Sequence, residues 1–310
     1  MIVVSGEALF DIFAVGTTPT GLALDARVGG SPFNVAVGLA RLGQPVGFFS
    51  GISNGFAGER LLQALRSEGV ATAAVARIDA PATLSLVGLD AHGVPSYAFY
   101  GEGAADRRLP LAALDRVAAG AAAFHFGSYA MVVEPVAATQ RALVERERQR
   151  SLIAYDPNVR LNVEPDLARW RAVLDWMVER SHLGKISEED LGLLAPGAAP
   201  GEMAADWLAR GVALVVVTRG AQGALGWTAQ AQASVPAVAC ELADTVGAGD
   251  SFQAALLAWL AEHGLLSAAA LRAIGADELA AGLRFAVQAA AITCSRRGAD
   301  LPRRAELPSG

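Results

Sequence analysis

Short apolar runs alternate along the chain with longer stretches whose apolar residues recur at helical spacing. Runs of the first kind predict buried strands, and stretches of the second kind predict amphipathic helices. The strands are expected at residues 2–5, 46–51, 122–126, 152–155 and 212–218. The helices are expected from Ser31 to Gly43 and near residues 57–67, 135–149, 166–180, 201–210, 251–263 and 277–295. Strand followed by helix, repeated, predicts an α/β fold with a mostly parallel sheet in a three-layer, Rossmann-like α/β/α arrangement.

Two parts of the chain break this alternation and look extended instead. Residues 83–89 and 95–100 are β-rich runs on either side of Asp90-Ala91-His92-Gly93, which is a hairpin signal. Residues 12–29 also look extended. We therefore expect a single domain over residues 1–310, from which segments of about 12–29 and 83–103 project as a small β lid.

Composition and charge limit the classes of ligand. The chain is 53% hydrophobic and 18% charged, so it can bury a sizeable core, and its net charge of −6 speaks against a nucleic-acid partner. Lys185 is the only lysine, so an anionic ligand must be held by arginine, backbone N–H groups or helix N-termini. Two cysteines, Cys240 and Cys294, form no disulfide framework and are interpreted as small buried residues rather than a redox pair.

The hydropathy pattern gives no sign of a membrane or export signal. The first ten residues, MIVVSGEALF, lack the basic segment of a signal peptide and are typical of a first strand. No charge-free apolar run approaches the roughly 18 residues that a membrane span requires. These features predict a cytoplasmic protein without a membrane partner.

The strongest chemical signal is the segment Asp244-Thr245-Val246-Gly247-Ala248-Gly249-Asp250, directly before an apolar helix. Small residues at 247–249 let the backbone approach a ligand, and their N–H groups lie at a helix N-terminus that favours anions. Asp250 then lies beside this anion hole, where it can take a proton from a hydroxyl while charge on a phosphoryl group is stabilised.

Two other nucleotide-binding motifs are excluded at the sequence level. A dinucleotide fingerprint would need glycine at position 252, which is Phe252, and this removes the basis for an oxidoreductase. A P-loop needs Gly-Lys-Ser/Thr, but Lys185 is followed by Ile186.

Two weaker signals lie near the start of the chain. In Gly29-Gly30-Ser31-Pro32-Phe33-Asn34, paired glycines lead into a helix whose first turn carries an amide, a group that suits sugar hydroxyls. Asp11 follows the first strand. Either signal alone also fits an ordinary turn or cap.

Together these segments resemble the PfkB (ribokinase-like) family of carbohydrate kinases. The resemblance spans essentially the whole chain, because it continues through His125-Phe126-Gly127-Ser128, Asp156-Pro157-Asn158-Val159-Arg160, Val217-Thr218-Arg219-Gly220 and residues 289–299. The HFGS and DPNVR segments are most similar to the fructokinase branch. The resemblance implies a ribokinase fold that transfers phosphate from ATP to the primary hydroxyl of a small sugar, and a homodimer formed through the lids.

The resemblance also assigns roles to individual residues. Asp250 would be the base, and Gly247, Ala248 and Gly249 would form the anion hole. The sugar would be bound by Asp11, Gly29, Gly30, Asn34, Tyr100 and Arg160, with Arg160 also near the γ-phosphate. The residues for ATP would be Lys185, Ser187, Thr218, Gly220, Gly223, Gly298 and Ala299. Mg²⁺ would come with ATP and be held indirectly by Asp190 or Glu189, and K⁺ would bind near Asp244.

Two departures from the family pattern bear on the nucleotide side. The family commonly has Asn-x-x-Glu where this chain has Ser187-Glu188-Glu189-Asp190, so the Mg²⁺ role falls on Asp190 or, in another register, on Glu189. An Asn often found beside the adenine pocket is replaced here by Val287 or Gln288.

Several substrates remain open at this stage. In 2-keto-3-deoxygluconate kinases an arginine typically follows paired tyrosines on the lid, whereas here Gly101 follows Tyr100. A neutral sugar therefore fits better, although Arg107 or Arg108 could supply the charge. Ribokinase or nucleoside kinase activity is a further alternative within the family. A sugar- or nucleotide-binding regulator without catalysis is the alternative from another class, and it would have no need for Asp250 beside an intact anion hole.

Overall fold

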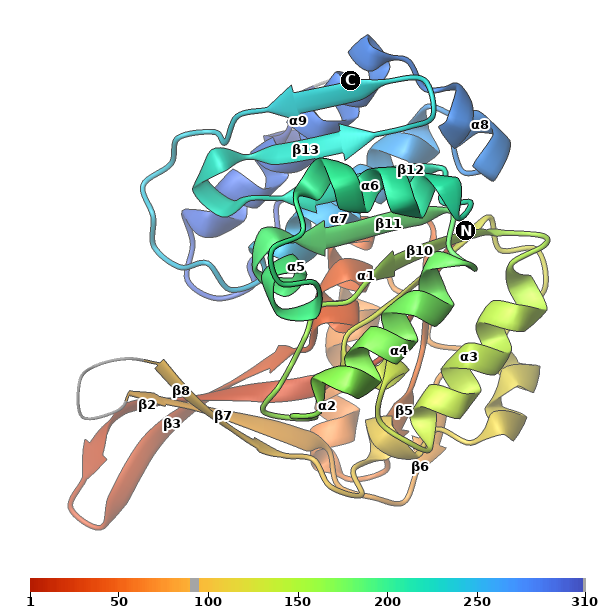
Figure 1. The fold of residues 1–310 in the computed structure, drawn as a ribbon. Coiled ribbons are helices and arrows are strands. Elements are labelled where there is room, and N and C mark those ends of the chain that lie inside the picture. The colour runs from red at the N-terminus through yellow and green to blue at the C-terminus, as the bar shows by residue number, and fades with distance from the viewer. Residues whose placement is uncertain (90–94, 309–310) are drawn as a thin grey trace.

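The computed structural model describes residues 1–89 and 95–308 and is built around one large sheet (Figure 1). Its eight strands follow the order β14-β13-β12-β11-β10-β9-β1-β4. Their bounds are β1 Ile2–Ser5, β4 Val46–Phe49, β9 Ala123–Gly127, β10 Leu152–Asp156, β11 Leu183–Ser187, β12 Leu214–Thr218, β13 Ala224–Trp227 and β14 Gln232–Val235. The strands from β4 to β12 pair in parallel, and β13 and β14 add an antiparallel edge. The predicted α/β class with a mostly parallel sheet is confirmed.

Helices cover both faces of this sheet, each layer on its own apolar cluster. The first layer is α1 Ser31–Arg41, α2 Phe56–Ser67, α7 Ala248–Glu262, α8 Ala268–Ala273 and α9 Ala276–Cys294. The second layer is α3 Val136–Glu147, α4 Leu167–Val178, α5 Glu188–Leu194 and α6 Pro200–Ala209. Strand β1 shows the division, because Ile2 and Val4 belong to the first cluster and Val3 belongs to the second. Five short 3₁₀ helices complete the described chain: η1 Ala105–Arg108, η2 Leu111–Arg116, η3 Tyr129–Met131, η4 Gly220–Gln222 and η5 Arg304–Glu306.

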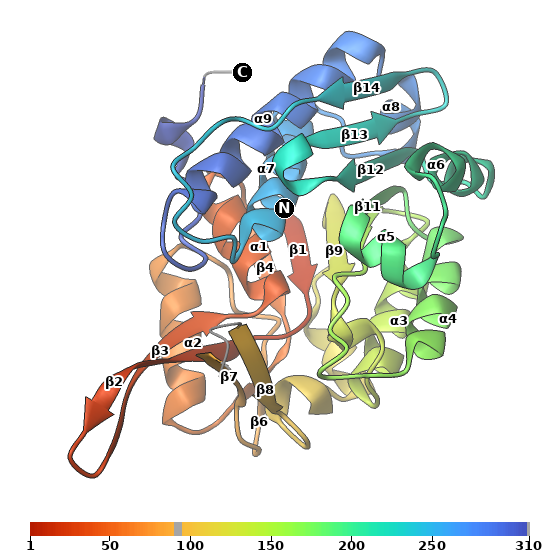
Figure 2. The ribbon, with the colours of Figure 1, turned by 60° about the vertical axis from the view of Figure 1, so that its left-hand side comes forward.

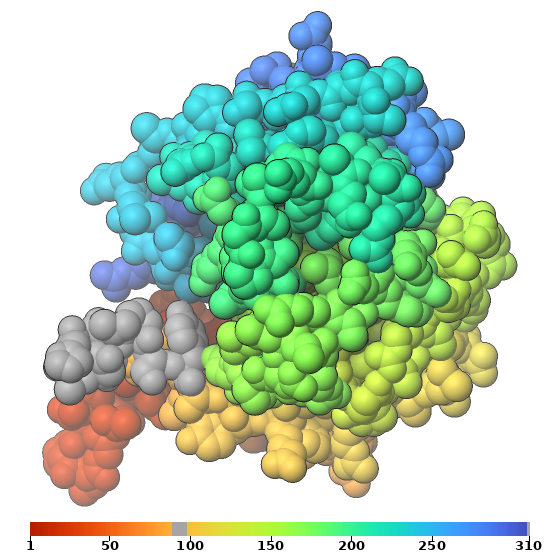
Figure 3. Space-filling model, in the orientation of Figure 1, coloured from red at the N-terminus to blue at the C-terminus, as the bar shows by residue number. Residues whose placement is uncertain are grey.

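A second sheet of four strands projects from the main body, and Figure 3 shows its β2–β3 end standing clear of the bulk at the lower left. The strand order is β3-β2-β7-β8, with β2 Leu9–Thr18, β3 Gly21–Gly29, β7 Thr83–Leu89 and β8 Pro95–Tyr100. The predicted turn at Asp90–Gly93 lies outside the described residues. A small parallel pair, β5 Gly51–Ser53 and β6 Ala76–Ile78, lies between β4 and β7 in the chain order.

Local chemistry explains where the two helices at the site begin. Gly30 caps α1 with a φ of 103°, and Pro32 occupies the first turn, where its missing N–H costs nothing. Gly247 caps α7 in the left-handed region with a φ of 80°. Figure 2 shows α1 and α7 side by side, which brings the first turns of the two helices together.

The structure differs from the predicted elements at several places. The run 46–51 divides into β4 and β5, and the run 212–218 begins as a strand only at Leu214. Six short elements, α5, α8, β6, β11, β13 and β14, were not predicted, because each has seven residues or fewer and too little apolar periodicity to detect. None of the helices in the described ranges is long and apolar enough to cross a membrane.

Candidate active site

A cavity of about 1460 Å³ lies over the carboxyl ends of the parallel strands, bounded by the four-stranded sheet and by α7 and α9. Parallel strands end at the same edge of a sheet, so side chains that follow them meet there. The predicted residues that line it are Asp11, Gly30, Asn34, Arg160, Lys185, Ser187, Glu189, Asp190, Thr218, Gly220, Gly223, Gly247, Ala248, Gly249 and Asp250. Gly29, Tyr100, Asp244, Gly298 and Ala299 do not line it.

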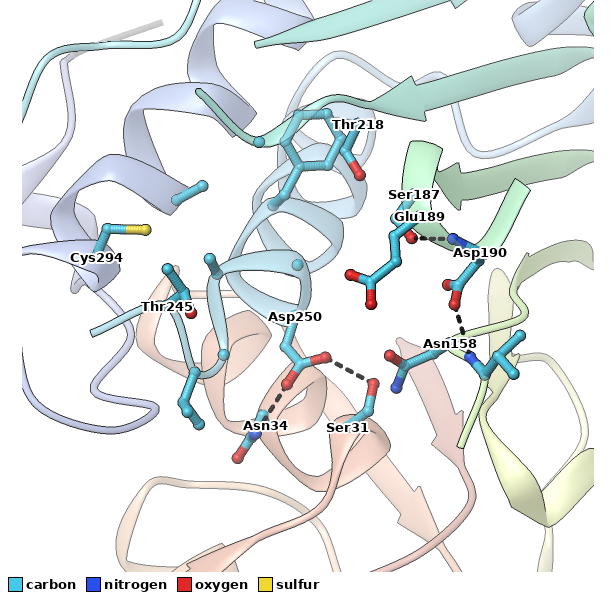
Figure 4. A pocket seen from close by; sticks show the side chains of 18 of the residues that line it. Ser31, Asn34, Asn158, Ser187, Glu189, Asp190, Thr218, Thr245, Asp250 and Cys294 are labelled. Carbon is cyan, nitrogen blue, oxygen red and sulfur yellow. Dashed lines mark hydrogen bonds between the residues drawn. The ribbon is translucent and has the colours of Figure 1, made fainter. Parts of the chain in front are cut away.

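Asp250 is held on both carboxylate oxygens by the start of α1. Ser31 Oγ donates to Oδ1 at 2.6 Å, and Asn34 Nδ2 donates to Oδ2 at 2.8 Å (Figure 4). Burial raises the pKa of Asp250, while these two hydrogen bonds and the charges of Arg160 and Lys185 oppose the rise. A buried, oriented carboxyl with a raised pKa is suited to accept a proton.

The backbone just before Asp250 presents hydrogen-bond donors to the cavity. Ala248 N–H already donates to Thr245 O at 3.2 Å, so it contributes less to an anion hole than predicted. The N–H groups of Gly247 and Gly249 have no backbone acceptor outside the helix in the part of the chain that the structure describes. Because they lie at the N-terminus of α7, they remain suited to an anion.

Lys185 adds a positive charge at the same place. Its Nζ is 2.7 Å from Asp156 Oδ2, and both side chains are only 4% exposed. A Cβ built on Gly249 would lie 3.4 Å from Lys185 Nζ, so the ammonium group is directly beside the start of α7. The ammonium group and the free N–H groups together can stabilise negative charge on a group transferred to a hydroxyl near Asp250.

The acidic residues after β11 are placed differently from one another. Ser187 caps α5 and accepts from Asp190 N–H at 3.0 Å, and Asp190 Oδ1 accepts from Val159 N–H at 3.2 Å. Burial, with the charge of Asp156, raises the pKa of Asp190 to about 6. Glu189 extends into the cavity between Asp190 and Asp250 (Figure 4). Within the described ranges no three His, Cys, Asp or Glu side chains are grouped as a metal site.

At the end of the cavity formed by the four-stranded sheet, the Asp11 carboxyl lies against Gly29. They lie on the neighbouring strands β2 and β3, and a Cβ on Gly29 would come within 2.5 Å of Asp11 Oδ2. Gly29 therefore leaves room for the Asp11 carboxyl rather than lining the cavity itself. Burial raises the pKa of Asp11, and the charge of Arg160 opposes the rise.

Glu7 is a site residue that sequence reasoning missed. It follows β1, lines the cavity, is 2% exposed, and its Oε2 has no hydrogen-bond partner among the described residues. Burial raises its pKa to about 8, and the charge of nearby Asp106 adds to the rise. Asp106 itself accepts from Thr83 Oγ1 at 2.6 Å and Tyr129 Oη at 2.7 Å. An acid directly after an apolar strand was the available signal.

Three predicted nucleotide-side residues brace the cavity wall instead of facing the cavity. Gly298 N–H donates to Asp244 Oδ2 at 2.8 Å, and Asp244 Oδ1 accepts from Val246 N–H at 3.1 Å. A Cβ on Gly247 would lie 2.6 Å from the Cβ of Ala299, so these two residues are in close contact. Gly298, Ala299 and Asp244 thus fix the loop that leads into α7.

Tyr100 is not brought to the cavity. Its side chain is 61% exposed, and the preceding residue, Phe99, lines the cavity in its place. Successive residues of a strand point to opposite faces, so a shift of one position exchanges an inward side chain for an outward one.

The far end of the cavity is apolar and open. One face of α9, formed by Val287, Ala290, Ala291 and Cys294, lies across from the loop that carries Val238, Cys240 and Leu242. Cys240 is exposed and Cys294 is half-buried, so their interpretation as small buried residues is wrong for Cys240.

Known proteins of one kind match the chain over its whole length. A family model described as "pfkB family carbohydrate kinase" matches residues 1–305. A fructokinase of Rhizobium leguminosarum bv. trifolii is 36% identical over 310 residues, covering 100% of this chain and 93% of the relative. A probable fructokinase-4 of Arabidopsis thaliana is 31% identical, covering 100% and 96%.

Solved structures give the same result. The fructokinase of Xylella fastidiosa with bound ATP superposes with a TM-score of 0.84 at 28% identity, covering 99% of this chain and 94% of that one. The fructokinase of Vibrio cholerae O395 in its fructose, ADP and calcium ion bound form gives a TM-score of 0.79 at 26% identity, covering 96% and 94%.

Proposed function

The chain belongs to the PfkB family of carbohydrate kinases, and from this premise we propose that it is a fructokinase that converts D-fructose to fructose 6-phosphate. The observation that carries the proposal is the placement of Asp250. Its carboxylate is oriented through both oxygens, at the N-terminus of α7 and close to Lys185. A binding protein without catalysis would have no use for this combination.

The reaction follows from these contacts. Asp250 takes the proton of the sugar's primary hydroxyl, and the hydroxyl oxygen bonds to the γ-phosphorus as the bond from that phosphorus to the bridging oxygen breaks. Lys185 and the N–H groups of Gly247 and Gly249 stabilise the negative charge on the phosphoryl group and on the departing ADP. Thr218, which ends β12, and Gly220 and Gly223, which follow it, line the path of the phosphates.

A neutral sugar suits the end of the cavity that Glu7, Asp11 and Asn34 line. Asp11 would disfavour an anionic substrate, and the amide oxygen of Asn34 points away from Asp250 and is available to a hydroxyl (Figure 4). Arg107 and Arg108, the cations that could bind a sugar acid from the lid, do not line the cavity, and Arg107 stacks 5.1 Å from the centre of the Tyr129 ring. These contacts favour fructose over 2-keto-3-deoxygluconate.

The charged groups also suit the ions that accompany ATP. We propose that Mg²⁺ enters with ATP and is held indirectly, with Glu189 and Asp190 as the nearest carboxylates. Mg²⁺ supplies neutralisation of phosphate charge. The residues fit this role because Glu189 extends toward the space between Asp190 and Asp250. K⁺ near Asp244 is a further proposal, supported by a carboxylate that braces the loop leading into α7.

We propose a cytoplasmic homodimer that forms through the four-stranded sheet. Large apolar side chains of this sheet are exposed, namely Val15, Leu22, Leu24 and Tyr100. A second copy covering them would remove apolar surface from water. Sedimentation equilibrium of the protein and of an L22R/L24R variant checks this proposal, because the variant is expected to shift toward monomer while it keeps its thermal stability.

The test of function is a coupled ADP-release assay with Mg-ATP and a panel of fructose, 2-keto-3-deoxygluconate, ribose, glucose, tagatose and adenosine. The expected result is a kcat/KM for fructose at least about tenfold above the next sugar, the scale on which a pocket contact discriminates. Preference for the keto acid would keep the kinase class and overturn the substrate. Absence of turnover with every sugar, from a folded protein that binds ATP, would overturn the proposed fructokinase.

A further inference from the structure

The only two cysteines of the chain both line the open, apolar end of the cavity. Cys240 lies in residues 236–243, which have no regular secondary structure, and its side chain is exposed. Cys294 is the last residue of α9 and is half-buried. Both line the same cavity, and Figure 4 shows the Cys294 sulfur pointing from α9 toward it. The catalytic reaction uses neither thiol.

Backbone hydrogen bonds hold the two segments against each other. Ala243 N–H and Asp244 N–H both donate to Cys294 O, at 2.8 Å and 3.2 Å. Cys240 is three residues before Ala243, and three residues span at most roughly 10 Å when fully extended. Cys240 is therefore tethered within reach of the end of α9. The charge of a Cys240 thiolate also contributes to the raised pKa of the Cys294 thiol. The two sulfur atoms are therefore close enough to interact electrostatically.

We propose that Cys240 and Cys294 form a reversible disulfide that closes the end of the cavity where the nucleotide base binds, so that kinase activity depends on thiol redox state. This inference rests on the proposed function, in which ATP binds along Thr218, Gly220 and Gly223 and its base would extend toward α9 and residues 236–243. It assigns a covalent modification site to two side chains that the phosphoryl transfer leaves unused.

The chemistry is thiol–disulfide exchange with a small oxidised disulfide such as oxidised glutathione. The Cys240 thiolate attacks one glutathione sulfur, forms a mixed disulfide and releases one glutathione thiolate. Cys294 then loses its proton and attacks the Cys240 sulfur, which forms the protein disulfide and releases the second glutathione. The protein loses two electrons and two protons, and two molecules of reduced glutathione gain them.

The order of attack follows from exposure and pKa. Cys240 is exposed and open to the oxidant. Burial first, with the charge of Cys240 second, raises the pKa of the Cys294 thiol, so less of it is thiolate at neutral pH. Cys294 is therefore the resolving thiol. Its attack is intramolecular because the loop is already fixed to α9.

A disulfide at this place would exclude a nucleotide base. The Cα atoms of a disulfide lie about 4.4–6.8 Å apart. A flat base between two surfaces needs roughly 7 Å, because carbon contacts lie at about 3.5–4.0 Å on each side. Residues 238–242 can move toward α9, because the described backbone hydrogen bonds between this loop and α9 begin at Ala243. Val238 and Leu242 are exposed to solvent.

The experiment exposes the full-length protein to oxidised glutathione, with and without prior saturation by Mg-ATP. Thiol titration, intact mass and non-reducing peptide mapping follow the bond. Binding of a fluorescent ATP analogue and fructose kinase activity follow its effect. We expect loss of both free thiols, a Cys240–Cys294 peptide, at least about tenfold weaker nucleotide binding, recovery with dithiothreitol, and protection by Mg-ATP.

Cys240→Ser and Cys294→Ser serve as matched controls, because each keeps the shape of the site and removes one thiol. Under oxidant, Cys240→Ser is expected to keep its nucleotide binding, whereas Cys294→Ser should accumulate the mixed disulfide at Cys240 and give no Cys240–Cys294 peptide. The absence of an intramolecular disulfide, or a disulfide that leaves nucleotide binding unchanged, would overturn the inference. Since mapping and nucleotide binding need no sugar turnover, failure of the fructokinase proposal is recognised separately in the activity assay.

Discussion

The two ends of the cavity differ in structure, because one is polar and fixed by hydrogen bonds, whereas the other is apolar and open. At the end proposed for the sugar, called the sugar end, buried polar groups are held by hydrogen bonds, as when Ser31 and Asn34 together orient Asp250. At the end proposed for the base of ATP, called the nucleotide end, apolar side chains face one another, and Leu242 is 66% exposed. The first end is fixed by the fold before any ligand arrives, and the second is an open slot between a loop and α9.

The difference matches what each end has to do. Charge develops where the phosphoryl group meets the sugar, so donors and acceptors there must be oriented in advance. A purine base changes no charge during the reaction, so shape and apolar contact suffice to hold it. We therefore expect substitutions at the sugar end to have large and selective effects, and substitutions at the nucleotide end to have small ones.

The largest effect is expected for Asp250→Asn. The substitution keeps the side chain's size and can still accept a hydrogen bond from Ser31 or Asn34, but it removes the proton acceptor. Turnover should fall about 10²–10⁴-fold, the usual contribution of a general base. Steady-state ADP release gives kcat, and calorimetry should show that ATP and fructose still bind.

Asp115→Asn is the matched control for this change, because Asp115 is an exposed acid on η2 outside the cavity. It should leave kcat unchanged. A D250N enzyme with near wild-type turnover would remove Asp250 from the mechanism, and the contrast between the two ends would lose its main support.

The second largest effect is expected for Asn34→Ala, whose kcat and fructose KM we compare with those of Ser31→Ala. Both substitutions remove one hydrogen bond to Asp250, but Asn34 also offers its amide oxygen to a sugar hydroxyl. Both should lower kcat, and only Asn34→Ala should raise the fructose KM, by about tenfold for one lost hydrogen bond. Separate titrations of ATP and fructose check this, and a change confined to the ATP KM would move the sugar site elsewhere.

The sequence could predict the fixed end better than the open one, for physical reasons. Residues 244–250 predict a helix that begins after a glycine cap and carries an acid in its first turn. These features depend only on residues that are neighbours in the sequence. The sequence does not distinguish Phe99 from Tyr100 as the residue that lines the cavity, because a two-residue period does not say which face of an isolated strand is covered. The family resemblance implies binding roles for Asp244, Gly298 and Ala299, yet these residues brace the wall through contacts between distant segments that no local pattern encodes.

A smaller effect should appear for Glu7→Gln as a function of pH. Because the pKa of Glu7 is raised to about 8 in the folded protein, its stability contribution is complete below the unfolded value of 4.5 and is lost as pH rises through 8. Glutamine keeps the neutral shape and does not titrate. Urea unfolding should show similar free energies of unfolding for both proteins at pH 5, whereas at pH 9 the variant should be more stable by a few kcal/mol.

This comparison separates Glu7 from its charged neighbours, Asp106 and Arg160, which are present in both proteins. If the difference between wild type and variant is the same at both pH values, Glu7 does not titrate in this range. The sugar end would then hold a carboxylate, not a neutral acid.

The smallest effect is expected for Leu242→Ala at the nucleotide end. Leu242 lines the cavity but is mostly in solvent, so truncation removes few contacts and should raise the ATP KM by no more than about threefold, as for residues at the rim of an interface. Leu111→Ala is the control, since Leu111 is 59% exposed and lies outside the cavity. Initial rates at saturating fructose measure the effect. A tenfold or larger rise would mean that the loop closes over the base when ATP binds, and the nucleotide end would then be ordered by its ligand rather than left open.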